Sequence, residues 1–261
     1  MIGNVATDRQ PPTQSIPQIE PLSVIVPYHR NQTGLAVTLA TLQAQIVPPK
    51  AIVVIDTSRN KSGFDIARRY ATRGEVPVVV EVAPRAGIYE AWNKGLSIVG
   101  EEDTLIINDD LLMPLNFIDI LSFSRAAVPA LAYAPVTPPR EHYRPDVDVD
   151  FAWWNEVPSR PEHFSQADWL PGFCFMLTRE ALSLVGHFDD GFKVWFGDDD
   201  YQERLKAMAK RANLPAIVRI NTLYAYHYGG RSYHYQTKTI QAKIDKDRAY
   251  FADKYGENTD R

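Results

Sequence analysis

Two clusters of acidic residues have the types and spacing that chemistry would require. Asn108–Asp110 follows a short apolar run, and Gly197–Asp200 comes later in the chain. Adjacent carboxylates repel each other, but together they suit a divalent cation that also binds phosphate, because Mg²⁺ and Mn²⁺ favour oxygen ligands. The first cluster therefore indicates a site for metal and phosphate. A plain turn after a strand is the alternative, since Asn and Asp favour turns.

The second cluster opens a predicted helix, where the helix dipole already favours one or two negative charges. Three successive carboxylates, Asp198, Asp199 and Asp200, exceed what helix capping requires. We therefore expect a carboxylate here to act as a general base on an acceptor hydroxyl. Arg204 lies four residues after Asp200, a spacing that favours an ion pair on one helix face.

Other residues are suited to contact phosphate or sugar. His227 lies among aromatic residues and glycines, where its imidazole would complete a metal shell, touch phosphate or serve the structure alone. Arg85 and Gly87 precede a predicted helix, whose backbone amides suit a phosphate. Aromatic rings stack on the apolar faces of sugars or fill a core, and both interpretations are open for Trp153, Trp154 and Trp169.

The elements that would position these residues alternate between strand and helix. Apolar, β-branched runs predict strands at residues 22–26, 51–55, 78–82 and 104–107. Helical spacing of apolar residues predicts helices at residues 35–46, 64–72 and 88–99. This alternation predicts an α/β fold with a mostly parallel sheet flanked by helices. Ligands gather at the carboxyl ends of such strands, so the polar residues there should share one edge.

The second half of the chain is less regular. Residues 135–168 are rich in Pro, Trp, His and Asp, and a long stretch without periodicity is usually functional or mobile. A strand at residues 173–177 and a helix at 179–185 follow. Further helices are predicted from about Asp200 and over residues 237–250. We predict a tail at residues 1–20, one domain at 21–232 and a helical extension at 233–261, which packs on the domain or forms a homodimer contact.

Composition excludes several classes of function. The chain has 261 residues, is 45% hydrophobic and carries a net charge of -4, so we expect no nucleic-acid partner. The one cysteine, Cys174, excludes an internal disulfide and a cysteine zinc site, and it reads as a small buried residue. With no signal peptide and no transmembrane segment in the sequence, we expect a cytoplasmic protein. Dinucleotide, Walker A, nucleophile-elbow and zinc-protease motifs are also missing from the sequence.

Taken together, the motifs resemble family 2 glycosyltransferases of the GT-A fold, a Rossmann-like fold of nucleotide-diphospho-sugar transferases. The resemblance covers roughly residues 22–230 and depends on the order of its segments, which are Val24–Tyr28, Val54–Asp56, Gly87–Gly95, Asn108–Asp110, Pro171–Phe173, Thr178–Glu180, Gly186–Asp190 and Gly197–Arg204. It implies an inverting enzyme of the hexosyltransferase class. Such an enzyme acts in glycan or polysaccharide biosynthesis with a nucleotide-diphosphate sugar donor, an Mn²⁺ or Mg²⁺ cofactor, and a glycan, lipid-linked or other hydroxyl acceptor.

The resemblance also assigns roles to single residues. The residues implied to contact the donor are Pro27, Tyr28, Arg30, Asp56, Arg85, Gly87, Asn93 and Asp109. The metal ligands implied are Asp110, the last acid of the family's D-x-D motif, and His227. The acceptor side is expected to use the three tryptophans and Gly172.

The sequence departs from the family pattern at two positions. Asn108 stands where the first acid of the metal motif belongs, and Gly197 stands where the acceptor motif has Glu. Alignment through the later arginine places the base at Asp198, and Asp199 remains a rival because the run of acids allows a shift by one residue. A nucleotidyltransferase on a related fold and a non-catalytic carbohydrate-binding homologue are the alternative functions.

Overall fold

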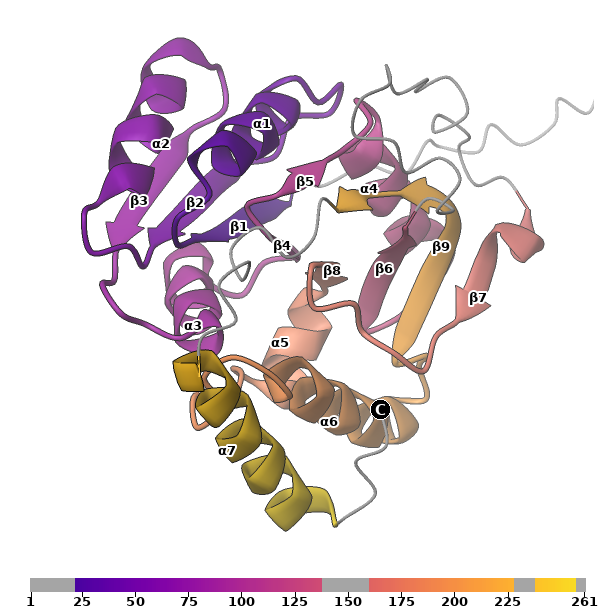
Figure 1. Cartoon of the computed structure of the whole chain (residues 1–261). Helices are drawn as coiled ribbons and strands as arrows, with labels where there is room; N and C mark the ends of the chain where they lie inside the picture. The colour runs from indigo at the N-terminus through magenta and orange to yellow at the C-terminus, as the bar shows by residue number, and fades with distance from the viewer. Residues whose placement is uncertain (1–21, 138–159, 228–237, 257–261) are drawn as a thin grey trace, which may run out of the picture.

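The computed structural model describes residues 22–137, 160–227 and 238–256, and it forms a large sheet covered by helices on both faces (Figure 1). The sheet has eight strands in the order β3-β2-β1-β4-β8-β6-β9-β7, and a second sheet pairs β10 with β5. The predicted α/β architecture with a mostly parallel sheet is confirmed.

The first half of the chain builds the parallel part of the sheet. Its elements, in chain order, are β1 (Ser23–Tyr28), α1 (Gln32–Gln43), β2 (Ala51–Asp56), α2 (Ser62–Arg73), β3 (Val78–Val82), α3 (Ile88–Val99) and β4 (Thr104–Ile107). β2 pairs with β1 and β3 in parallel, and β1 also pairs in parallel with β4. β1 and β4 are buried on both faces, which explains why their sequences are nearly continuous runs of apolar residues.

The second half of the chain mixes strand directions. Its elements are β5 (Leu111–Leu112), α4 (Phe117–Ala127), β6 (Ala132–Val136), the 3-10 turn η3 (Pro161–His163), β7 (Phe164–Gln166), β8 (Cys174–Leu177), α5 (Arg179–Val185), α6 (Gly197–Ala212), β9 (Ile217–Tyr224), β10 (Tyr226–His227) and α7 (Lys238–Tyr255). β8 runs antiparallel between β4 and β6 and joins the two halves of the sheet.

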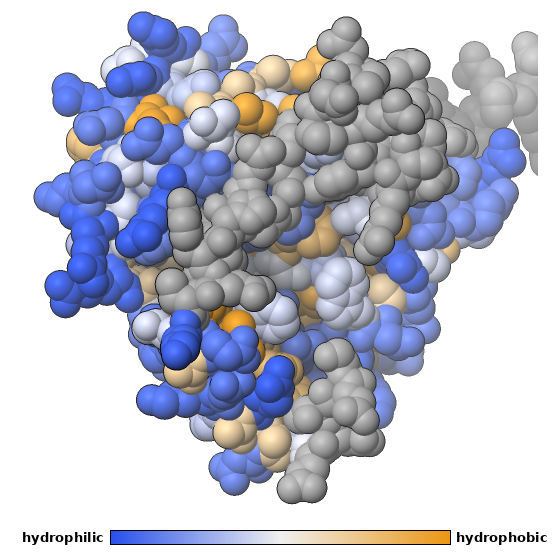
Figure 2. Space-filling view, viewed as in Figure 1, coloured by the Kyte–Doolittle hydropathy of each residue, from blue (hydrophilic) through white to orange (hydrophobic). Residues whose placement is uncertain are grey.

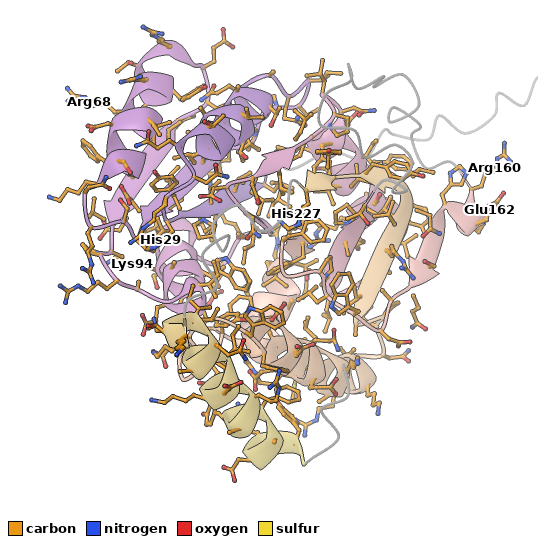
Figure 3. All side chains as sticks on the ribbon, in the orientation of Figure 1. His29, Arg68, Lys94, Arg160, Glu162 and His227 are labelled. Carbon is orange, nitrogen blue, oxygen red and sulfur yellow. The ribbon has the colours of Figure 1, made fainter. Side chains whose placement is uncertain are left out.

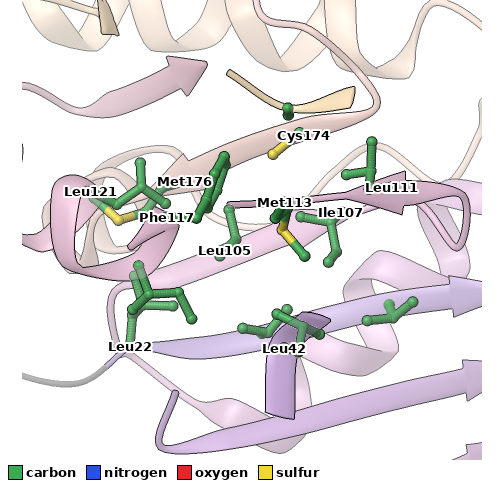
Figure 4. Packing of buried hydrophobic residues seen from close by; sticks show 14 of the residues in the cluster. Leu22, Leu42, Leu105, Ile107, Leu111, Met113, Phe117, Leu121, Cys174 and Met176 are labelled. Carbon is green, nitrogen blue, oxygen red and sulfur yellow. The ribbon is translucent and has the colours of Figure 1, made fainter. Parts of the chain in front are cut away.

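Two apolar cores lie on opposite faces of the sheet. One core packs α1, α2 and α4 against the sheet, and Figure 4 shows part of it, including Leu42, Leu105, Phe117 and Met176. Cys174 belongs to this core and is buried, as predicted, and burial raises the pKa of its thiol. The other core packs α3, α5 and α6 against the opposite face and includes Phe251 of α7.

Several boundaries differ from the sequence prediction. α1 ends at Gln43, so Ile46 lies beyond the helix with 68% of its surface exposed, although its spacing places it on the apolar stripe. α6 begins three residues before Asp200, and α7 extends five residues beyond the predicted end at residue 250. α4 was not predicted, and the strand expected before His227 had no bounds, which the structure gives as Ile217–Tyr224.

On the face seen in Figure 2, the described residues at the surface are mostly hydrophilic, and apolar residues occur there in small groups. No helix within residues 22–137, 160–227 and 238–256 is long and apolar enough to cross a membrane.

Candidate functional site

The carboxyl end of β1 places Tyr28 in the interior and Arg30 at the surface. Pro27 and Tyr28 are buried, and the Tyr28 hydroxyl lies 2.7 Å from Ser62 Oγ at the start of α2. Burial, with further contributions from the Asp56 and Asp109 carboxylates, raises the pKa of Tyr28. Arg30 is exposed beside this strand end, where it is free of the core and able to reach a ligand.

Asp56 ends β2 and is fully buried. Its Oδ1 accepts hydrogen bonds from the backbone N–H of Ser58 (2.8 Å) and from Ser58 Oγ (2.5 Å), and Oδ2 accepts one from the Phe64 N–H (3.0 Å). The carboxylate therefore fixes the turn into α2. Contact with a base, which the family resemblance implies for Asp56, would have to use the remaining acceptor capacity of this carboxylate.

Arg85 and Gly87 lie in the turn that leads into α3. Arg85 is exposed and has φ of 71°, in the left-handed region that is uncommon for residues other than glycine. Gly87 approaches the loop before α6 so closely that a Cβ atom would lie 2.9 Å from the Lys193 carbonyl oxygen. This turn therefore connects the edge of the sheet where the parallel strands end to the segment that carries the second acidic cluster.

Asn93 has a structural role that its position in the motif did not predict. Its Nδ2 donates to the Phe188 carbonyl (2.8 Å), and its Oδ1 accepts from the Phe188 N–H (2.9 Å). Both functional groups of the amide are thus used to hold the 186–196 loop against α3. The contact with the diphosphate that the family resemblance implies for Asn93 would have to use the second N–H or the remaining lone pair of this amide.

The first acidic cluster follows β4 and is held from two sides. Thr38 Oγ1 of α1 donates to the Leu111 carbonyl and accepts from the Leu111 N–H, both at 3.1 Å. Leu111 pairs with His227 across β5 and β10. The result is that Asp110 Oδ1 lies 3.1 Å from His227 Nε2, and both Asp109 and Asp110 are buried.

Asp110 and His227 are spaced so that both could bind one divalent cation. Ligands at cis positions of an octahedral Mg²⁺ or Mn²⁺ centre are about 3 Å apart, given metal–oxygen bonds of about 2.1 Å. Among the described residues, Asp110 Oδ1 is buried and receives no hydrogen bond of good geometry. No three His, Cys, Asp or Glu side chains of this part of the chain form a complete metal site, so phosphate oxygens or water would supply the remaining ligands.

The second acidic cluster places Asp198 beside α3 and β8. Tyr89 donates its hydroxyl hydrogen to Asp198 Oδ1 at 2.9 Å. Gly172 lies on the other side, where a Cβ atom would come 2.2 Å from Asp198 Oδ2. Burial raises the pKa of Asp198 to about 6, the Asp199 carboxylate adds to the shift, and the Tyr89 hydrogen bond opposes it.

Asp199 is partly exposed, whereas Asp200 is fully buried. Asp200 accepts from Arg204 Nε at 2.9 Å, which confirms the predicted i,i+4 pair, and also from Lys254 (2.5 Å) and Tyr255 (2.9 Å) of α7. This environment argues against Asp200 as the base, because its buried carboxylate binds side chains of both α6 and α7.

The Gly172–Phe173 dipeptide brings the two acidic clusters together. Gly172 contacts Asp198, and the Phe173 ring stacks on the His227 ring with centroids 4.6 Å apart and an interplanar angle of 10°. Phe173 also accepts the Asn108 N–H at its carbonyl oxygen, at 2.8 Å. Figure 3 shows His227 near the middle of the molecule, and His29 beside the first half of the sheet.

Two exposed tryptophans accompany the second acidic cluster. Trp169 is 56% exposed, and its neighbour Leu170 donates its N–H to Gln202 of α6 at 2.8 Å. Trp195, which the sequence did not single out, is 52% exposed and lies three residues before Asp198. Trp153 and Trp154 lie outside the described residues. These two tryptophans are thus exposed on the surface, whereas the large buried aromatics are core residues.

Tyr89 and Phe173 are part of the site, although neither was singled out from the sequence. Each has the appearance of a core aromatic in the sequence, and Tyr89 is indeed buried. The signal that would have found Tyr89 is its position one turn before Asn93, at the start of the helix that faces the acidic cluster.

Comparison with known proteins identifies the family and the fold. Residues 23–182 match the family model for glycosyl transferase family 2, and a search of curated proteins gives no match. A similar solved structure is the mannosyltransferase PcManGT from Pyrobaculum calidifontis in complex with GDP-Man and Mn²⁺ (19% identity, TM-score 0.59, 90% of this chain and 65% of that chain).

Two further structures are similar. S. aureus TarS 1–349 has 15% identity and a TM-score of 0.57, over 92% of this chain and 73% of that one. GalNAc-T7 with UDP, GalNAc and Mn²⁺ has 15% identity and a TM-score of 0.59, over 81% of this chain and 44% of that one. This chain thus spans less than two thirds of the first and third structures. The shared architecture is the GT-A fold, and since the family model covers more than half of the sequence, the chain belongs to glycosyl transferase family 2.

Proposed function

We propose that this chain is an inverting glycosyltransferase that moves a sugar from a nucleotide-diphosphate donor to an acceptor hydroxyl. The observation that carries the proposal is the Gly172–Phe173 dipeptide, which has Asp198 on one side and the His227–Asp110 pair on the other. Family membership and the nucleotide-bound or Mn²⁺-bound state of two similar structures support the same conclusion.

The donor would bind at the carboxyl ends of β1, β2 and β4. Arg30 and Arg85 are exposed there and offer positive charge to a diphosphate. Asp110 and His227 would hold a divalent cation, which when bound stabilises the charge that develops on the leaving diphosphate. Asp109 is buried beside this pair and adds negative charge to the cation site.

Asp198 would remove the proton from the acceptor hydroxyl as that oxygen attacks the anomeric carbon. A base is most effective when its pKa lies near the working pH, and burial brings the pKa of Asp198 to about 6. At pH 7 the carboxylate is still mostly ionised and therefore able to accept a proton. The Tyr89 hydroxyl fixes one carboxylate oxygen, which leaves the other for the acceptor.

Matched substitutions in the acidic cluster test this assignment. Asp198→Asn should lower kcat by about 10²–10⁴, the usual contribution of a general base, while the donor Kd stays nearly unchanged. Asp199→Asn keeps the Tyr89–Asp198 contact and should retain most of the activity. Transfer rates and calorimetric binding of a nucleotide diphosphate would measure both effects. Loss of activity only in Asp199→Asn would move the base to Asp199.

A further inference from the structure

The C-terminal helix α7 lies outside the segment that matches the family model and packs against the turn that carries Asp198. In Figure 1, α7 lies beside α6 and below α3. Its inward face carries Asp247 and Phe251, and both side chains are buried. A carboxylate on the buried face of an amphipathic helix is costly unless it is fully hydrogen-bonded.

Asp247 is hydrogen-bonded to three successive backbone amides. The Lys193 N–H lies 3.1 Å from both carboxylate oxygens, and Oδ2 also accepts from Val194 (2.7 Å) and Trp195 (3.0 Å). Successive amides that point at one anion form an anion-binding nest. Here the anion is a side chain of the same protein, which fixes the backbone of residues 193–195.

The nest is also held from the side of α3. The Lys193 carbonyl accepts the N–H of Ile88 at 3.3 Å, and Lys193 Nζ donates to Glu90 at 2.6 Å. Residues 193–195 are thus fixed between α7 and the start of α3, the helix that also supplies Tyr89.

A strained residue connects the nest to the acidic cluster. Phe196 has φ of 68°, which costs energy for a residue with a Cβ atom and persists only where the surroundings impose it. Gly197 follows, and its Cβ position is blocked at 2.6 Å by the Tyr89 ring. On the far side of the cluster, Asp200 is bound to Lys254 and Tyr255 of α7.

We propose that Asp247 is a positioning residue that holds the 193–195 nest so that the turn after it presents Asp198 to the acceptor. This role depends on the proposed function of Asp198, because it concerns the placement of that carboxylate. Asp247 does not reach the reacting atoms itself. α7 is then a required part of the acceptor side of the site and more than an appended helix.

Asp247→Asn tests the proposal in the full chain, with Asp245→Asn as the matched control on the same helix. The Asn side chain directs an N–H group toward amide donors, so the nest should open. We expect kcat to fall by up to about 10²-fold, since a displacement of about 1 Å has effects of this size, while the donor KM changes little. The acid limb of the pH profile should also move to lower pH as Asp198 becomes more hydrated. Among the described residues, the exposed Asp245 binds Gln241 and Arg248, which both lie on α7. Its substitution should therefore leave kcat, the donor KM and the pH profile unchanged.

Hydrogen exchange provides a readout that does not need activity. In the unmodified protein the amides of residues 193–195 should exchange as slowly as those of α6, and in Asp247→Asn they should exchange at least about tenfold faster. Rapid exchange of these amides in the unmodified protein would overturn the proposal even if no variant folds. Faster exchange of the 193–195 amides in Asp247→Asn together with an unchanged kcat would also overturn it. A protein that transfers no sugar but keeps the exchange pattern would instead refute the proposed function and leave the nest established.

Discussion

At the scale of single residues, the account depends on the environment of Asp198. Its carboxylate lies between the Tyr89 hydroxyl and the backbone of Gly172, and it is flanked by Asp199. Burial and a neighbouring charge of the same sign both disfavour its ionised form. These contacts give one carboxylate of the cluster a basicity suited to proton removal, whereas Asp200 is neutralised by Arg204 and Lys254.

The pH dependence of the reaction should reflect this environment. Because the base acts when deprotonated and has a pKa of about 6, kcat/KM should be level above pH 7 and fall about tenfold per pH unit well below 6. Tyr89→Phe removes a hydrogen bond that lowers this pKa, so the acid limb should move to higher pH. Initial rates from about pH 4 to about pH 8, an interval of about two units on either side of the pKa, would show both effects. A profile that stays flat down to pH 5, or a limb that Tyr89→Phe leaves in place, would exclude Asp198 as the base.

Gly172 offers a second test at this scale. An alanine here would place its Cβ 2.2 Å from Asp198 Oδ2, so the carboxylate would have to turn away from Tyr89. Gly172→Ala should therefore lower kcat strongly with little effect on donor binding or on the thermal midpoint, since only a side chain must move. Activity near that of the unmodified protein would mean that the position of Asp198 is not critical. Measurements of the transfer rate and of the thermal midpoint of Gly172→Ala would distinguish misfolding from a misplaced base.

At the scale of elements, the sequence predicted the first half of the fold well. β3, β4 and α3 have the predicted bounds, and so does α5 in the second half, because each combines a clear apolar period with a turn signal at its ends. α4 was missed, and the strand before His227 was expected without bounds, since pairing with β6 and β7 rather than local pattern determines where β9 lies. Asp56 and Asp110 could be placed at the ends of strands from the sequence pattern, and Asp198 could be placed at the start of a helix.

The roles of Asn93 and Asp247 could not be read from the sequence, for physical reasons. Asn93 lies within a family motif, yet its amide nitrogen and oxygen both bind the backbone of Phe188, which is 95 residues away. Asp247 belongs to a helix rich in charged residues, where one acid resembles the next until the packing shows which of them is buried. Long-range contacts of this kind depend on the tertiary fold and leave no local signal.

At the scale of the whole molecule, the antiparallel strand β8 joins the two halves of the sheet, which under the proposed function would hold the donor and the acceptor. The parallel strands β1, β2 and β4 end near Arg30, Asp56 and Asp110, and β8 starts next to the dipeptide that touches both acidic clusters. The family model covers residues 23–182, which include the first cluster. The second cluster and α7 lie beyond the segment that the family model matches.

Metal removal should inactivate the whole protein reversibly. We expect a chelator to abolish transfer and Mn²⁺ to restore it, because the diphosphate would otherwise approach the buried Asp109 and Asp110 without a cation between them. His227→Ala should raise the Mn²⁺ concentration needed for half-maximal rate, and His187→Ala, on an exposed loop, should not. Full activity in the presence of the chelator would contradict a role for the metal.

The most direct test of the account is a crystal structure of the protein with a nucleotide diphosphate and Mn²⁺, with anomalous data to locate the metal. We predict an Mn²⁺ peak at bonding distance, about 2.2 Å, from Asp110, and we predict that the diphosphate oxygens bind the same ion. The terminal phosphate, to which the donor sugar would be attached, should face Asp198. A metal peak away from Asp110 and His227, or a diphosphate whose leaving-group side faces away from Asp198, would contradict the central claim.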